Sequence, residues 1–301
     1  MADGATAGAT SGATSGAGDG VRTGLVLGGG GVTGIAWELG VLAALRAEGL
    51  DLTGADTVVG TSAGSVVGAQ VTSAVDLDQW YEEQLAPPDH EIGAAFPLRT
   101  ALSLGVRMVL PGDGRVRRQR IGRAARRAHP GDGSERIAVI EARLRGPDGA
   151  PLAWPDRDLR ITAVDADSGS FTVFDRDSGV DLLHAVAASC AVPLVWPPVA
   201  INGRSYVDGG MRSAANADLA TGCEVVVAVA PLLRSVSRHH RVRVQLERTG
   251  ARHRLVIAPD RQALEAIGRN VLDPTRRTPA ARAGWAQGRR LAPRVAEHWP
   301  H

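Results

Sequence analysis

The stretch TVVGTSAGSVVGAQ, residues 57–70, places a serine between a short apolar run and a segment with helical spacing. Residues 57–59 predict a buried strand, and the helix that follows the serine is expected to extend into the high seventies. Gly60, Ser62 and Gly64 fit the pattern G-x-S-x-G, in which a serine occupies a sharp strand-to-helix turn. Flanking glycines avoid Cβ collisions at such a turn, and the helix amides face any negative charge that develops there. The pattern also occurs in turns without catalysis, but the surrounding strand and helix favour a nucleophile.

A second turn of the same kind lies earlier in the chain. Residues 24–27 (GLVL) predict a short buried strand, a glycine run follows, and residues 33–46 have apolar positions at helical spacing. With the strand and helix around Ser62, this makes a βαβα unit. Such units form parallel sheets with right-handed crossovers, so an α/β fold is expected.

The glycine run itself has two interpretations. The segment GGGVTG, residues 29–34, fits the dinucleotide pattern G-x-G-x-x-G through Gly29, Gly31 and Gly34. That function requires an acidic residue at the end of the second strand, where this chain has Gly60 and Thr61. No Gly-Lys-Ser/Thr sequence follows to make a phosphate-binding P-loop either. The backbone N–H groups of Gly29, Gly30 and Gly31 are instead candidates for stabilising an oxyanion at a helix N-terminus.

The remaining apolar segments extend the α/β pattern. Two β-like runs joined by the turn DADSG predict a hairpin, and two strongly apolar runs further on predict buried strands. We expect a three-layer α/β/α fold with a mostly parallel central sheet. The predicted elements are strands at 159–164, 170–174, 205–207, 224–230 and 255–258, a helix at 181–188, and helices over most of the chain after residue 258.

One carboxylate follows a predicted strand in a glycine-rich setting. The strand at 205–207 leads directly into Asp208, Gly209 and Gly210, where the glycines indicate close approach of another part of the backbone. An isolated Asp-Gly is most often a plain turn. Asp208 becomes a candidate base because of the serine and glycine motifs that precede it.

Composition excludes several classes of function. The formal net charge is +2, and all 34 basic residues are arginine. The one dense run, Arg115 to Arg127, is interpreted as a solvated helix face or loop, with a patch for anionic lipid head groups as the alternative. Because the basic charge is otherwise spread out, no nucleic-acid partner is expected. The two cysteines, Cys190 and Cys223, are expected to be free thiols in a reducing compartment, and no metal or cofactor is predicted.

The chain divides into a tail and one folded unit. Residues 1–20 are a Gly/Ala/Ser/Thr-rich segment predicted to be disordered, without the basic and apolar regions of a secretory signal. Residues 21–301 are predicted to form a single catalytic domain with a partly helical insertion near 86–135 that could act as a lid. A cytoplasmic protein that can contact a membrane peripherally is expected; no run of eighteen apolar residues is present.

In order and spacing, GGGGVTG, GTSAG and DGG resemble the motifs of the patatin-like phospholipases, and the likeness covers most of residues 22 to 290. The segment AVAASCAVPLVWPPVAINGRSYVDGGM resembles that family's approach to its catalytic aspartate. The resemblance implies a lipid acyl hydrolase with a Ser-Asp dyad that acts on phospholipids or other acyl lipids. By this resemblance Ser62 is the nucleophile and Asp208 the base. The oxyanion loop is Gly29, Gly30 and Gly31, supported by Gly34, Gly60, Gly64, Gly209 and Gly210.

The chain departs from the family pattern at one position of the glycine loop. The family often has a basic residue just before the last glycine, and this chain has Thr33 there. The backbone donors are retained, but any help from that side chain in holding an anionic phosphate is lost. The departure favours a neutral ester substrate. Head group, acyl length and oligomeric state cannot be derived from the sequence.

Two other functions remain open at this point. An α/β-hydrolase esterase with a Ser-Asp-His triad would also contain G-x-S-x-G, and the histidines that follow Ser62 include those at positions 184, 239, 240 and 253. That fold places several strands before its nucleophile, whereas only one is predicted here, and His184 is expected to be a satisfied helix residue. The other alternative is a non-catalytic lipid-binding protein of the same fold.

Overall fold

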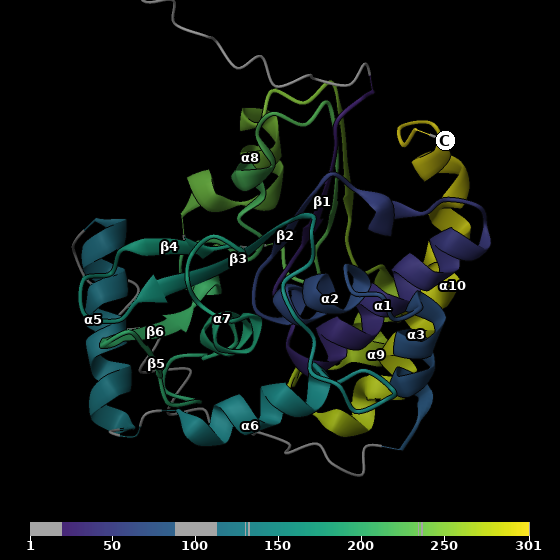
Figure 1. Cartoon of the computed structure of the whole chain (residues 1–301). Helices are drawn as coiled ribbons and strands as arrows, with labels where there is room; N and C mark the ends of the chain where they lie inside the picture. Colours follow the sequence, from purple (N-terminus) through teal and green to yellow (C-terminus); the bar gives the residue numbers. More distant parts are fainter. Residues whose placement is uncertain are drawn as a thin grey trace, which may run out of the picture.

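The structure is a computed structural model, and it describes residues 20–87, 113–129, 131, 133–233, 235 and 237–300. Helices flank a mostly parallel sheet of eight strands in this part of the chain (Figure 1). The strands are β1 (Thr23–Leu27), β2 (Thr57–Gly60), β3 (Asp158–Asp165), β4 (Phe171–Phe174), β5 (Val199–Ile201), β6 (Arg204–Asp208), β7 (Val225–Val229) and β8 (His253–Ile257). The α-helices are α1 (Gly31–Ala47), α2 (Ala63–Val71), α3 (Leu77–Leu85), α5 (Gly114–Ala128), α6 (Ser134–Arg143), α7 (Leu182–Ser189), α8 (Val242–Arg248), α9 (Arg261–Ile267) and α10 (Arg277–Ala296).

The strand order confirms the predicted parallel sheet. The order is β5-β6-β3-β2-β1-β7-β8, with β4 also paired to β3. Strands β3, β2, β1, β7 and β8 run parallel, while β4, β5 and β6 are antiparallel to their neighbours. Every residue of the central strands β1, β2 and β7 is buried, because both faces of the sheet are covered.

Alternate residues of the central strands enter two separate cores. On one face Leu25, Leu27 and Val58 pack with residues of α1, α2, α7 and α10. On the other face Val26 and Val59 pack against α8 and the short 3-10 helix Ala217–Ala220. Further along this second face, β3 and β6 pack against α5. The architecture is therefore three layers, α/β/α, as the sequence predicts.

Two strands share one edge of β3, and this arrangement positions the candidate site. Strand β4 pairs with residues 161–164 of β3, so β4 occupies one edge there. Strand β2 pairs with β3 up to Ile161, opposite Gly60, and β6 pairs with it from Ala163, opposite Asp208. Ile161 pairs with both β4 and β2, and Ala163 pairs with both β4 and β6. Because a strand residue has one partner on each edge, β2 and β6 both lie along the edge of β3 opposite β4. Strands β2 and β6 run in opposite directions along this edge, so their carboxyl ends meet beside Thr162.

Several sequence-based assignments need correction. The helix that begins after Ser62 ends at Val71, and a separate helix, α3, begins at Leu77. The break occurs because the hydroxyls of Thr72 and Ser73 bond back to helical carbonyls, and Asp76 caps the N-terminus of α3. Strand β5 and helix α6 were not predicted.

The predicted tail and insertion lie partly outside the described residues. Of residues 1–20 the structure describes residue 20, and within 86–135 it leaves out 88–112, 130 and 132, so the disordered tail and the lid stay predictions. The arginine run forms α5. The buried residues of this helix include Ile121 and Ala125, and its arginines are partly or fully exposed. No helix of the described chain combines the length and apolar character needed to cross a bilayer.

Helices α1 and α10 cross in close contact, and the contact depends on glycines. A Cβ added at Gly40 of α1 would lie 2.2 Å from the Ala281 carbonyl oxygen of α10, and one added at Gly284 would lie 2.3 Å from the Trp37 carbonyl oxygen. The Trp37 indole N–H also donates to Gln287 Oε1 at 3.1 Å. α10 can lie close to α1 because these glycines carry no side chain.

We expect Gly40→Ala to lower the free energy of unfolding by about 1–3 kcal/mol, because the two helix backbones must separate. Urea unfolding monitored by circular dichroism checks this expectation. Gly54→Ala is the matched control: nothing lies within 4 Å of its added Cβ, so that variant should match or exceed the wild type. Equal unfolding midpoints for the two variants would contradict the glycine-dependent contact.

Candidate active site

Ser62 lies at the turn between β2 and α2 with a strained backbone. Its φ and ψ are 53° and −117°, a conformation that side-chain-bearing residues rarely adopt and that costs about 1–3 kcal/mol. The Ser62 amide donates to Ser189 Oγ at 2.9 Å. The Ser62 carbonyl oxygen accepts from the Ser65 amide at 2.9 Å, the Ser65 hydroxyl at 2.6 Å and the Cys190 thiol at 3.2 Å. These bonds hold the strained turn through its backbone, and the side chain of Ser62 lines the cavity.

The glycines on either side of Ser62 allow the turn to pack against the strands. A Cβ at Gly64 would lie 2.2 Å from the Leu27 carbonyl oxygen, and one at Gly60 would lie 2.6 Å from Ser65 Cα. Real Cβ atoms do not approach other atoms so closely. The two glycines of G-x-S-x-G are therefore required by packing, as the sequence analysis expects.

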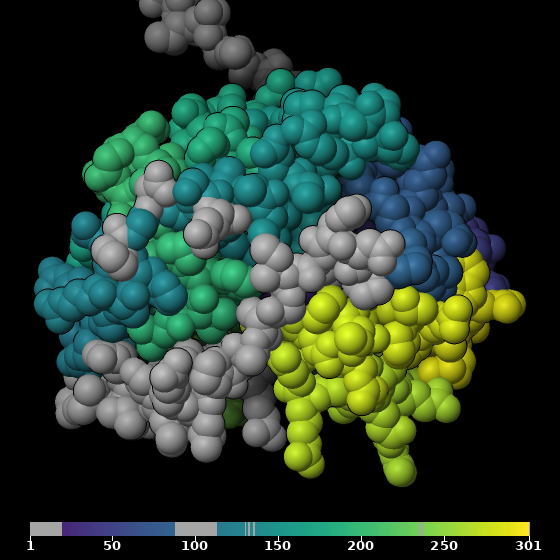
Figure 2. Space-filling model, turned by 90° about the horizontal axis from the view of Figure 1, so that it is seen from below, coloured from purple at the N-terminus to yellow at the C-terminus, as the bar shows by residue number. Residues whose placement is uncertain are grey.

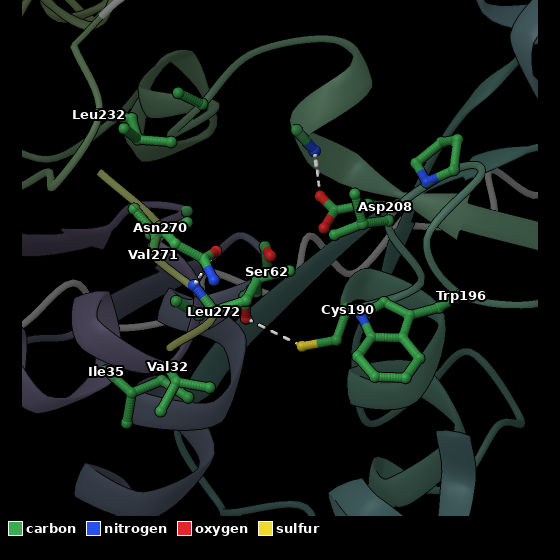
Figure 3. A pocket seen from close by; sticks show the side chains of 18 of the residues that line it. Val32, Ile35, Ser62, Cys190, Trp196, Asp208, Leu232, Asn270, Val271 and Leu272 are labelled. Atoms are coloured by element: carbon green, nitrogen blue, oxygen red, sulfur yellow. Dashed lines mark hydrogen bonds between the residues drawn. The ribbon is translucent and has the colours of Figure 1, made fainter. Parts of the chain in front are cut away.

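Asp208 ends β6 and is almost completely buried, with 5% of its surface exposed. Its Oδ1 accepts from the Gly210 amide at 2.7 Å, and its own amide donates to the Ala191 carbonyl oxygen at 3.0 Å. Burial raises the pKa of Asp208 to about 6, while the Ser62 side chain, the Gly210 amide and the charge of Arg136 act to lower it. Ser62 and Asp208 thus face one another across the same space (Figure 3).

A buried hydrogen-bond network fixes the meeting point of β2 and β6. Thr162 of β3 lies 3.0 Å from the Thr61 hydroxyl and 3.3 Å from the Gly60 carbonyl oxygen. The Asn216 amide donates to both threonine hydroxyls, at 3.1 and 3.3 Å. Asn216 is fully buried. Sequence reasoning missed this network, because Thr162 and Asn216 belong to no recognisable motif and Thr61 occupies a variable position of G-x-S-x-G.

The glycine loop differs from the prediction in which amides it leaves free. The Gly29 amide donates to the Ala214 carbonyl oxygen at 2.7 Å, so it is already used. The amides of Gly30 and Gly31 have no acceptor within the described residues, and the same holds for Ala63 at the N-terminus of α2. All three residues line the cavity. The free donors are therefore Gly30, Gly31 and Ala63, of which the sequence analysis named the first two.

A buried carboxyl group supports the glycine loop from α1. Glu38 is fully buried, and its Oε1 accepts from the Gly28 amide at 2.8 Å. Desolvation raises the pKa of Glu38 well above its ordinary value, and the hydrogen bond from the Gly28 amide acts to lower it. Its second oxygen, Oε2, has no partner in the described chain.

Ser62 and Asp208 line a cavity of about 430 Å³ with mainly apolar walls. The cavity lies between the segment that contains α6 and the C-terminal segment before α10, and these two segments occupy the same face of the molecule (Figure 2). The labelled side chains of Val32, Ile35, Val271 and Leu272 lie on one side of Ser62, and Cys190 and Trp196 lie on the other (Figure 3). The remaining lining residues include Arg136, Arg143, Val192, Pro193, Met211, Leu232 and Arg269.

The histidines considered for a triad do not reach this cavity. His184 Nδ1 bonds to Asp181, the N-cap residue of its own helix, at 2.8 Å, and its side chain is partly exposed. His239 contacts Arg248, and the His253 ring packs against His298. Of the described residues that line the cavity, none is a histidine. Nor does the described part of the chain gather three metal-ligating side chains in one place.

The raised pKa of Asp208 makes stability depend on pH in a defined direction. Because the folded-state pKa of about 6 exceeds the unfolded value, folding favours the protonated form, and this contribution is lost as pH rises through about 6. Between about pH 4 and about pH 7, the wild type should lose up to about 3 kcal/mol of unfolding free energy relative to Asp208→Asn. Urea unfolding of both proteins across this range tests it. Ser62→Ala keeps the carboxyl group and should lose stability with rising pH in the same direction as the wild type, by at least as much, because the Ser62 side chain acts to lower the pKa of Asp208. Identical pH profiles for wild type and Asp208→Asn would contradict the assignment.

Comparison with known proteins identifies the family of this chain. The model of the family described as patatin-like phospholipase matches residues 25–221, which is more than half of the chain. Comparison with curated protein sequences gives no match.

Among solved structures, VipD from Legionella pneumophila is 13% identical with a TM-score of 0.47, covering 91% of this chain and 67% of that one. The type III effector protein ExoU is 16% identical with a TM-score of 0.38 over 91% and 53% of the two chains. In a structure of full-length SpcU in complex with full-length ExoU from Pseudomonas aeruginosa, the matched chain is 17% identical with a TM-score of 0.39. That match covers 91% of this chain and 53% of the other. This chain therefore spans about half the length of the ExoU chains. With the family model matched over most of its folded length, the chain belongs to the patatin-like phospholipase family.

Proposed function

We propose that this chain is a serine lipid acyl hydrolase of the phospholipase A type, with Ser62 as nucleophile and Asp208 as base. The observation that carries the proposal is the meeting of β2 and β6 on one edge of β3, which brings Ser62 and Asp208 to one cavity. Membership of the family supports a lipid substrate.

In the first step the Asp208 carboxylate accepts the hydroxyl proton of Ser62 as the Ser62 oxygen attacks the ester carbonyl carbon. A base works best when its pKa lies near the working pH. With a pKa of about 6, Asp208 is about nine-tenths ionised at neutral pH and is a stronger base than an exposed aspartate. Burial at the end of β6 therefore supplies basicity that other hydrolases obtain from histidine.

The tetrahedral intermediate carries negative charge on the former carbonyl oxygen. The unpaired amides of Gly30, Gly31 and Ala63 line the cavity beside Ser62, at the N-termini of α1 and α2. Amides at helix ends favour negative charge, and one such donor is typically worth about a hundredfold or more in turnover. Glu38 supports this loop by holding the Gly28 amide, two residues before Gly30.

Collapse of the intermediate expels the alcohol, which takes the proton from Asp208, and leaves an acyl-enzyme on Ser62. Water then attacks the acyl carbon, its proton passes to Asp208, and the fatty acid is released as Ser62 recovers its proton. The apolar cavity walls around Val32, Val271 and Leu272 suit an acyl chain. Leu232, which lines the same cavity with 45% of its surface exposed, suits contact with a lipid surface.

The alternatives are less well supported by the geometry. A Ser-Asp-His triad needs a histidine at Asp208 or Ser62, and His184 instead pairs with Asp181 on α7. A non-catalytic lipid-binding protein would have no need of a strained serine beside a buried carboxylate with a raised pKa.

Turnover of a nitrophenyl ester tests the assigned roles. We expect Ser62→Ala to lose about a thousandfold or more in kcat, because the nucleophile is removed, and Asp208→Asn to lose about a hundredfold or more. His184→Ala should keep kcat within a factor of about two, since it removes a surface pair. Collapse of activity in His184→Ala, with retained activity in Asp208→Asn, would replace the dyad by a triad.

A further inference from the structure

Arg136 places a buried cation at the candidate active site. It lies in the first turn of α6, and only 7% of its surface is exposed. Its guanidinium lies over the Trp196 ring, 4.6 Å from the ring centre, and both residues line the cavity that contains Ser62 and Asp208. A charged side chain this deeply buried normally has a paired counter-ion.

No carboxylate pairs directly with Arg136 within the described residues. The charge of Asp208 acts on Arg136 without a direct hydrogen bond between them. The polar contact of Arg136 is with the Cys190 thiol, whose pKa burial raises. The Nε–H group of Arg136 is buried without an acceptor in the described chain. The cavity therefore contains a guanidinium with unused hydrogen-bonding capacity.

The position of Arg136 bears on the substitution at the glycine loop. Thr33 occupies the position of the glycine loop where the family often has a basic residue. It is fully buried, and its hydroxyl donates to the Val271 carbonyl oxygen at 3.3 Å. Thr33 thus offers nothing to a substrate phosphate. Arg136 reaches the same cavity from α6, more than a hundred residues further along the chain.

We propose that Arg136 is the specificity-determining residue for an anionic phosphoryl group carried by the substrate, close to the ester that Ser62 attacks. This inference rests on the proposed function. The Trp196 ring covers one face of the guanidinium and leaves its in-plane N–H groups for the phosphate oxygens, a planar arrangement that arginine provides and lysine does not. The preferred substrate is accordingly a phosphate-bearing acyl ester, rather than the neutral ester that Thr33 alone would favour.

Two short-chain substrates with the same acyl ester separate this role from a general effect on catalysis. The first is a monomeric dihexanoyl phospholipid, and the second is dihexanoylglycerol, which lacks the phosphate. We expect Arg136→Gln to lower kcat/KM for the phospholipid by about tenfold to a hundredfold and for the neutral ester by less than about threefold. Arg136→Lys should recover part of the phospholipid activity. Arg294→Gln, at an exposed position of α10, is the matched control and should leave both activities unchanged.

The wild-type protein gives a second measurement that does not depend on folding of a variant. Glycerol 3-phosphate should inhibit hydrolysis of dihexanoylglycerol competitively, and glycerol at the same concentration should not. Equal loss of both activities in Arg136→Gln with a shifted pH profile would assign Arg136 to tuning Asp208 and overturn the proposal. Equal inhibition by glycerol and its phosphate would also overturn it. Absence of any ester hydrolysis in the wild type would instead refute the proposed function itself.

Discussion

The candidate site depends on a single constraint of the sheet: β2 and β6 end against each other on one edge of β3. Gly60 pairs with Ile161 and Asp208 with Ala163, so the two strand ends are separated along β3 by Thr162. The Thr162 hydroxyl joins the network that includes Thr61 and Asn216. A Cβ at Gly209 would lie 2.3 Å from that hydroxyl oxygen, so the residue after Asp208 must be glycine. Serine and aspartate, far apart in the chain, therefore meet because of backbone pairing and not because of loop flexibility.

Buried charge is the second feature that organises the site. Within the described chain, two carboxyl groups and one guanidinium lie in or beneath the cavity with little or no solvent contact: Glu38 under the glycine loop, Asp208 at the end of β6, and Arg136 on α6. Burial raises the pKa of both carboxyl groups, while the positive charge of Arg136 lowers that of Asp208. The contacts of Asp208 with Ser62 and the Gly210 amide favour its ionised form and limit the rise of its pKa to about 6. For Glu38 the only opposing contact is the Gly28 amide, and burial raises its pKa well above the ordinary value. Burial thus makes Asp208 a stronger base at the end of β6 and disfavours the charged form of Glu38 beneath the glycine loop.

Local patterns were sufficient for most of the fold and for the positions of the central residues. The apolar runs at β1, β2, β7 and β8 and the turns around Ser62 predict strands and helices correctly because their signals are local. The break between α2 and α3 could have been found from Asp76, which caps α3 directly after a polar pair. Pairing of β6 with β3 is non-local, so the sequence indicated that Asp208 follows a strand but not which strand it lies beside. Arg136 could not be predicted as a cavity residue, because its position depends on a short helix in a segment without a clear periodic pattern. The use of the Gly29 amide by Ala214 is likewise a tertiary contact that no motif records.

The proposed mechanism requires Ser62 to attack a carbonyl while Asp208 takes its proton. The most direct measurement is peptide mapping by mass spectrometry after reaction with a fluorophosphonate, which traps an activated serine covalently. We predict one adduct, on the peptide that contains Ser62, with labelling that slows in Asp208→Asn and disappears in Ser62→Ala. An adduct on another serine that persists in Ser62→Ala, or labelling of Ser62 at the same rate in Asp208→Asn, would contradict the claim.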